Sequence, residues 1–95
     1  MSAGARVTVL LYGAFRDFAG GRRRASVEAA TVGEALARLV DDVPTLRERI
    51  RDEHGRLRDH LNVFANDEEI GGLEGERTPL RDGDTVHVIP AISGG

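Results

Sequence analysis

The sequence predicts an α+β fold in which a small mixed sheet carries one main helix across one face. Two apolar, β-branched runs, at residues 7–12 and 85–89, have the length and composition of buried strands. One stretch, residues 31–43, repeats apolar side chains at helical spacing. The chain has 95 residues, which is enough for one hydrophobic core and too short for two. We therefore expect residues 1–95 to form a single domain.

The chain begins with a predicted hairpin. Residues 7–12 form its first strand, and residues 24–28 form a shorter second strand that we expect to pair with the first. Residues 13–21 are expected to be a connection, from which Phe15 and Phe18 cover the core.

Three consecutive arginines, Arg22 to Arg24, mark the turn of this hairpin. Charged side chains at such a place discourage the edges of two sheets from associating, and we favour that interpretation. A basic binding patch is the alternative.

The main helix is predicted to begin at Thr31. Thr31 and Glu34 match a capping box, in which the hydroxyl accepts a hydrogen bond from one early N–H group and the carboxylate from another. Pro44 ends the helix, because a proline pushes the preceding residue out of helical geometry. The apolar side chains between these limits form one stripe that faces the sheet: Val32, Leu36, Leu39, Val40 and Val43.

The second half is predicted to consist of short elements. A brief helical piece, marked by Leu46 and Ile50, is expected to close near Gly55. The remaining expectations are a strand at 61–65, a turn at Asn66–Asp67, a strand stub at Glu69–Ile70, a loop over 71–79, a tight turn at 82–84 and the last strand at 85–89, stopped by Pro90.

The order is therefore strand, strand, helix, strand, short strand, strand. A single long helix buries its apolar stripe most economically by crossing one face of the sheet, and the crossover after the hairpin should be right-handed. This is the β-grasp, or ubiquitin-like, arrangement.

The composition excludes several kinds of site. The chain has no cysteine, which excludes disulfides, thiolate metal sites, cysteine nucleophiles and a carried persulfide. All 13 cationic side chains are arginine, and 16 carboxylates leave a net charge of −3, too acidic for a dedicated nucleic-acid binder. The apolar run at residues 7–15 is shorter than a membrane span and lacks a signal-peptide cleavage site. We expect a cytoplasmic protein that binds neither nucleic acid nor membrane.

No pattern predicts an active site within the chain itself. His54, His60 and His87 lack the spacing of a helical metal pair, so we expect no metal site. Residues 82–84 lack the twelve-position ligand pattern of a calcium loop. No serine has evident histidine and aspartate partners. We therefore expect a protein that is not an enzyme and binds no cofactor of its own.

The chemistry that remains lies at the end of the chain. Residues 91–95 follow directly on the last strand, and we expect a flexible tail that reaches up to about 15 Å from the sheet. Gly94 and Gly95 lack Cβ atoms and, behind Ile92 and Ser93, suit passage through a narrow channel. The reactive group of this tail is the α-carboxylate of Gly95. A partner enzyme that adenylated it with ATP would make a mixed anhydride, which sulfide could convert to a thiocarboxylate.

Motifs spread along the chain carry a resemblance to a known family. They are residues 13–20, the helix start at 31–36, the strand and turn at 62–66, residues 80–86 and the ending Pro90-Ala91-Ile92-Ser93-Gly94-Gly95. Together they resemble the ubiquitin-like sulfur carriers related to the molybdopterin synthase small subunit and to the carriers of thiamin and cysteine biosynthesis. The similarity covers residues 6–95. The complete absence of lysine is a departure from the family pattern.

This resemblance implies a protein cosubstrate. Gly95 would be adenylated, with ATP, by an adenylyltransferase and sulfurtransferase of the ubiquitin-activating type, and then thiocarboxylated. A sulfur-accepting biosynthetic enzyme would receive the sulfur. The acceptor pathway stays open among cysteine, a thiosugar or other sulfur metabolite, molybdopterin and thiamin, with residues 62–70 closer to the cysteine and specialised-metabolite carriers. We expect a monomer that meets its partners in turn.

Strand alternation predicts a docking face for these partners. In a β-grasp sheet the first, last and third strands are neighbours, so alternate side chains of all three share one open face. The apolar members of this set are Leu10, Tyr12, Phe64 and Ile89. An apolar cluster on a small protein marks an interaction site. A register error of one residue, or cover from a loop, is the alternative.

Two other functions stay open. An activated Gly95 could form an isopeptide bond with a lysine of another protein, which would make the chain a ubiquitin-like modifier. A non-catalytic β-grasp binding module with an incidental tail would keep its function without Gly94 and Gly95.

Overall fold

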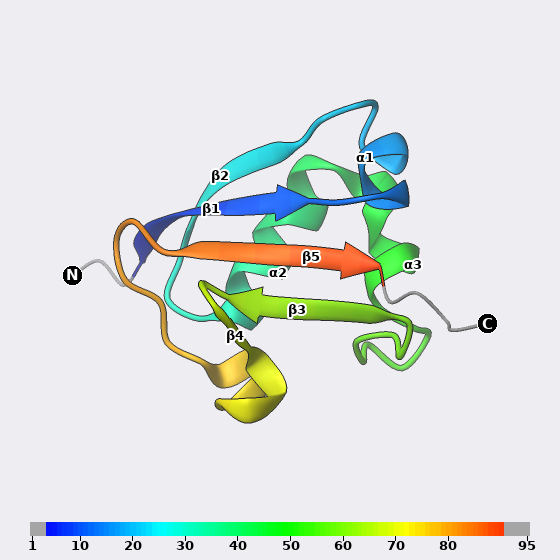
Figure 1. Cartoon of the computed structure of the whole chain (residues 1–95). Helices are drawn as coiled ribbons and strands as arrows, with labels where there is room; N and C mark the ends of the chain where they lie inside the picture. The colour runs from blue at the N-terminus through cyan, green and yellow to red at the C-terminus, as the bar shows by residue number, and fades with distance from the viewer. Residues whose placement is uncertain (1–3, 91–95) are drawn as a thin grey trace.

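In the computed structural model, which describes residues 4–90, five strands form one mixed sheet in the order β2-β1-β5-β3-β4 (Figure 1). The strands are β1 (Ala5–Leu11), β2 (Arg24–Ala29), β3 (Leu61–Ala65), β4 (Glu68–Glu69) and β5 (Thr85–Pro90). The helices are α1 (Ala14–Phe18), α2 (Val32–Asp42) and α3 (Arg47–Ile50), joined by the short 3₁₀ turns η1 (Pro44–Leu46), η2 (Ile70–Gly72) and η3 (Gly75–Arg77).

The strand pairing is that of the predicted β-grasp. β1 and β2 form an antiparallel hairpin, β1 and β5 run parallel, and β3 pairs antiparallel with β5. The first and last strands of the chain therefore lie side by side at the centre of the sheet. In Figure 1 the strands lie in front of α2, the one long helix. The predicted α+β fold, with a main helix across one face, is confirmed.

The hydrophobic core lies between α2 and the face of the sheet that it covers, which we call the inner face. Leu36 and Leu39 of α2 are completely buried, as are Val9 of β1 and Val88 of β5. These side chains alternate along the strands and recur at three- and four-residue spacing along the helix, as the sequence predicts.

The start of α2 is capped by its own side chains. The Oγ1 atom of Thr31 accepts a hydrogen bond from the N–H group of Glu34 at 3.2 Å. The carboxylate of Glu34 accepts from the N–H group of Ala30 at 2.7 Å, one residue earlier than in the standard capping box. The helix ends before Pro44, where Val43 leaves helical geometry (φ −131°, ψ 78°), as predicted.

Two predicted boundaries before β3 were wrong. The connection over residues 13–21 contains helix α1, because one turn of helix carries Phe15 down into the core, where it is 4% exposed. The second helical piece ends at Ile50 and does not reach Gly55. Arg51 is already extended and pairs with Leu57 in an isolated bridge, so the helix cannot continue.

The later boundaries also shift. The strand stub is Glu68–Glu69, because Ile70 turns into η2 and is buried, and the predicted loop over 71–79 contains most of η2 and all of η3. The last strand ends at Pro90 as predicted but includes that residue, one more than the predicted range 85–89. Pro90 pairs with Leu61. Proline is tolerated there because a strand end does not need another N–H donor.

A partly buried ion pair holds the irregular second half against α3. Arg51 donates two hydrogen bonds to the carboxylate of Glu76 in η3, at 3.1 and 2.5 Å. These bonds raise the pKa of Arg51 above its ordinary value, against the opposing effect of burial. The pair therefore joins two segments that share no strand ladder.

Candidate functional site

The predicted reactive residue, Gly95, lies outside the described residues, as do Gly94, Ser93 and Ile92. The structure describes the strand that leads to them. β5 is flanked by β1 on one side and by β3 on the other. The point from which the chain continues beyond Pro90 is thus fixed by two neighbouring strands.

The start of α1 lies directly against this point. Gly13 has φ +58°, and a Cβ atom added to it would lie 2.7 Å from Cγ of Pro90. On the other side, Pro90 pairs with Leu61 at the beginning of β3. Gly13 therefore allows a close approach that a residue with a side chain would prevent.

The four residues of the predicted docking face share one side of the sheet, which we call the outer face. Leu10 and Phe64 lie in register on either side of His87, on β1, β3 and β5 respectively. Ile89 lies two residues further along β5, and all four apolar residues are partly exposed. The register error considered from the sequence is therefore absent from these strands. Their role in docking stays a prediction.

His87 is at the centre of the outer face, and sequence reasoning did not assign it to the docking face. Its Nδ1 atom lies 2.8 Å from the hydroxyl of Tyr12, and the two rings are 5.8 Å apart, centre to centre. Strand alternation did place His87 outward. Its position between Leu10 and Phe64 depends on the register of three strands, which one sequence does not specify.

Opposite charges flank the outer face. On the β2 side, Arg16 lies over the ring of Tyr12 at 5.8 Å and donates from Nε to the carbonyl oxygen of Leu11 at 2.9 Å. Arg24 pairs with Leu10 across the hairpin. On the β4 side, Glu69 pairs with Phe64. The apolar side chains of Leu10 and Phe64, which we call the apolar row, thus lie between an arginine on β2 and a glutamate on β4.

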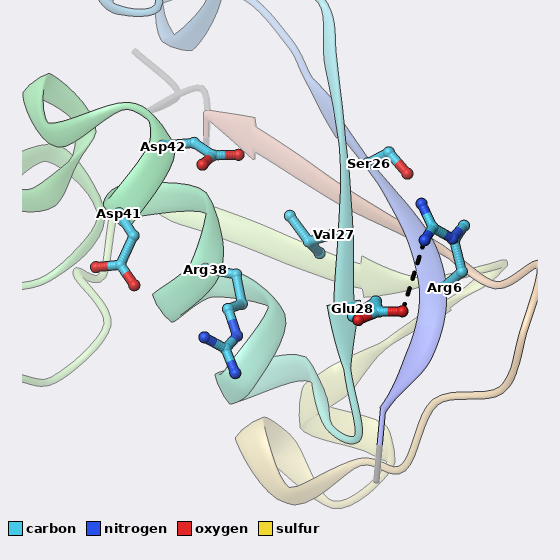
Figure 2. Close-up of a pocket in the computed structure, with 7 residues that line it drawn as sticks. All are labelled: Arg6, Ser26, Val27, Glu28, Arg38, Asp41 and Asp42. Atoms are coloured by element: carbon cyan, nitrogen blue, oxygen red, sulfur yellow. Dashed lines mark ion pairs between the residues drawn. The ribbon is translucent and has the colours of Figure 1, made fainter. Parts of the chain in front are cut away.

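A hollow of about 450 Å³ lies around the edge strand β2 (Figure 2). Arg38, Asp41 and Asp42 reach it from α2, whereas Arg6 and Ser26 lie on the far side of β2 in this view. Arg6 forms an exposed ion pair with Glu28 at 3.5 Å. The lining wraps around a strand edge and has mixed charge, so the hollow is an open surface and not an enclosed substrate pocket.

Across residues 4–90, no three histidine, aspartate or glutamate side chains are grouped in a way that could hold a metal ion. No helix within the same range has the length and apolarity to cross a bilayer.

Known proteins match this chain over nearly its whole length. The model of the ThiS family matches residues 9–95. The sulfur carrier protein CysO of Mycobacterium tuberculosis is 32% identical over 91 residues, which are 94% of this chain and 98% of the relative.

Two solved structures have the same fold. The small archaeal modifier protein 1 of Methanosarcina acetivorans superposes with a TM-score of 0.90 at 29% identity, over 99% of this chain and all of that one. A chain from the Amycolatopsis orientalis BexX/CysO complex superposes with a TM-score of 0.83 at 30% identity, over 94% of this chain and 99% of that one.

Proposed function

Because this chain belongs to the ThiS family and is 32% identical to the sulfur carrier protein CysO, we propose that it carries sulfur as a thiocarboxylate on Gly95. The observation that carries the proposal is the match of the family over residues 9–95, which includes the final Gly94 and Gly95. The chain acts as a cosubstrate, and the chemistry occurs in the active sites of its partners.

The proposed chemistry has two steps on the α-carboxylate of Gly95. An oxygen of the carboxylate attacks the α-phosphorus of ATP, and pyrophosphate leaves, so that an acyl adenylate forms. Sulfide supplied by a sulfurtransferase then attacks the carbonyl carbon, and AMP leaves with its oxygen. The product is a thiocarboxylate whose sulfur is anionic and nucleophilic. ATP is thus consumed by the activating partner and is not a cofactor of this chain.

The fold supports this division of labour. β5 is a central strand, so a partner that binds the outer face has a rigid reference for the position of Pro90. Leu10, Tyr12, Phe64 and Ile89 offer that partner a partly exposed apolar surface, with His87 between them. A partner fixed there would direct the last five residues into its own channel.

Two kinds of partner follow: an activating adenylyltransferase and a biosynthetic enzyme that accepts the sulfur. A related carrier has been solved as the BexX/CysO complex, which favours an acceptor that forms a defined complex with its carrier. Cysteine, thiosugar, molybdopterin and thiamin pathways are all compatible with the residues of this chain.

Intact-protein mass spectrometry tests the proposal. The chain is incubated with an activating enzyme of this type, ATP and a sulfide source. We expect a mass gain equal to one oxygen replaced by sulfur, located in the C-terminal peptide and lost in a variant without Gly95. An unchanged mass, with the activating enzyme shown to convert its own carrier, would contradict the proposal.

A second function uses the same activation. The similarity to a small archaeal modifier protein favours conjugation, in which a lysine amine of another protein attacks the acyl adenylate of Gly95, AMP leaves, and an isopeptide bond forms with loss of a proton. Adducts of higher mass that form in cells and disappear on deletion of Gly95 would support this role. Sulfur transfer without such adducts would leave the carrier role alone.

A further inference from the structure

Charge is unevenly distributed between the two ends of the sheet. Residues 12–24, which contain α1 and the turn into β2, carry four arginines and one carboxylate. Residues 66–84, which contain β4, η2 and η3, carry seven carboxylates and two arginines. Figure 1 places these segments at opposite corners of the molecule, with α1 on the side towards which β5 points. The net charge of −3 therefore hides a positive region beside the end of β5.

Three of these arginines, Arg16, Arg23 and Arg24, form a group that we call the arginine rim. Together with Leu10, Leu11 and Tyr12 they line a hollow of about 200 Å³. Leu10 and Tyr12 belong to the predicted docking face, so the arginine rim and that face share a border.

Within residues 4–90, no carboxylate lies within ion-pair distance of the arginine rim. Arg23 and Arg24 are exposed, whereas Arg16 is partly buried. The guanidinium of Arg16 is positioned by its bond to the carbonyl oxygen of Leu11 and by the ring of Tyr12. An arginine held in this way retains free N–H donors for a carboxylate.

Protection of a sheet edge explains only part of this group. Arg24 is on the edge strand β2, where a charged side chain discourages association with another sheet. Arg16 is on α1 and folds back over Tyr12, where it protects no strand edge. Arg16 thus places part of the arginine rim beside Tyr12, at the border of the docking face.

We propose that the arginine rim binds an acidic segment of the activating enzyme and so fixes the orientation in which that enzyme receives the end of β5. This inference rests on the proposed function. Glu69, which pairs with Phe64 at the opposite border of the docking face, would repel the same acidic segment. The partner therefore meets opposite charges at opposite borders of the face, and one of two orientations is favoured.

A protein partner fits these observations better than a nucleic acid. A phosphate backbone is long and uniformly negative, so it would also meet the carboxylates of residues 66–84. A short acidic segment would contact the arginine rim alone. Electrostatic interactions fall off over about 8 Å at physiological ionic strength, which confines the attraction to this border.

Charge reversal of two exposed arginines tests the proposal against a matched control. The rim variant is Arg23→Glu with Arg24→Glu, and the control is Arg77→Glu with Arg81→Glu, two arginines that are also exposed and lie in the carboxylate-rich region. Both variants change the net charge equally. Association with the activating enzyme is measured without ATP at low and high salt, after circular dichroism has shown that both variants are folded.

We expect the rim variant to associate about tenfold more slowly at low salt, and the difference to shrink at high salt. The control should stay within about twofold of the unmodified chain, because its carboxylate-rich region already repels an acidic partner. Equal effects in both variants, or no effect in either, would overturn the proposal. Binding of a single-stranded RNA probe by the unmodified chain and not by the rim variant would overturn it too, since it assigns the rim to nucleic acid.

A second measurement separates this inference from the proposed function. A short polyglutamate peptide is titrated into the ¹⁵N-labelled chain, with no enzyme present. Amide shifts confined to residues around Arg16, Arg23 and Arg24 are expected, and equal shifts around Arg38 and Arg77 would overturn the inference. Failure of the proposed function would be recognised by a different result: the mass of the unmodified chain would stay unchanged in the thiocarboxylate assay.

Discussion

The inner and outer faces of the sheet are made by the same strands, but only one of them is closed. On the inner face, Leu11 and Val86 are 1% and 0% exposed beneath α2. On the outer face, Leu10, next to Leu11 in the chain, is partly exposed and lies beside His87. The difference teaches that apolar residues in one strand have separate environments: most are buried and hold the fold together, whereas Leu10 of β1 and Phe64 of β3 stay partly exposed, as a docking face would require.

The largest expected effect on stability comes from making the same substitution at two neighbouring residues, one on each face of the sheet. Leu11→Ala should lower the free energy of unfolding by about 2–5 kcal/mol, because a fully buried side chain is lost and leaves a cavity. Leu10→Ala should cost about 1 kcal/mol or less, since its site is open to water. Urea unfolding measures both. Equal losses would mean that the outer face is as closed as the inner one.

A second pair tests the contact between α1 and the end of β5, where the two faces meet. Gly13→Ala should destabilise the protein by about 2 kcal/mol or more, because the new Cβ atom meets Pro90 and the positive φ adds strain. Gly55→Ala should cost about 1 kcal/mol, since Gly55 has φ +79° but open space around it. Thermal unfolding of the two variants gives the difference. A Gly13 variant no worse than the Gly55 variant would show that the close approach is unimportant.

A third change addresses the outer face alone. Phe64→Ala should weaken docking to the activating enzyme by about 1–2 kcal/mol, roughly tenfold in Kd, while the fold persists. Thr8→Ala is the control, because Thr8 is also partly exposed and lies on the same face outside the apolar row. Isothermal titration calorimetry with the enzyme distinguishes them. Unchanged binding of the Phe64 variant would remove this face from the docking surface.

The smallest expected effect is a pH dependence of the protein's stability that arises outside both faces of the sheet. The carboxylate of Asp52 accepts hydrogen bonds from the backbone N–H groups of Arg56 and His54. These bonds lower the pKa of Asp52 in the folded protein, and the bond from Arg56 has the largest effect. The stability that Asp52 contributes is therefore complete above its unfolded pKa of about 3.9 and is lost as the pH falls through the lower folded value. Asp52→Asn should flatten this part of the acid-unfolding curve. An unchanged curve would contradict the assignment.

The regular part of the fold could be predicted because each element carries a local signal. Thr31 with Glu34 at the start of α2, Pro44 after its end, and alternation along residues 61–65 are all visible within a few residues of sequence. The β-grasp topology then follows from the order of the elements and the need to cover one face of the sheet.

The missed features depend on contacts between distant residues. The helix at residues 14–18 forms because Phe15 reaches a core built by other strands. The pairing of Pro90 with Leu61, and the bond between Tyr12 and His87, join residues far apart in the chain. Alternation predicted which way each side chain of the docking face points. The register that puts His87 in its middle required the assembled sheet.

The central place of β5 also determines how the molecule responds to a pull on its end. A partner that draws the chain into a channel applies force along the axis of β5, which is parallel to β1 and antiparallel to β3. The hydrogen bonds on both sides lie across that force and are loaded together in shear, so they cannot open one at a time as in a peeled edge strand. Under the proposed function, the sheet would therefore resist unravelling when a partner pulls on the end of the chain.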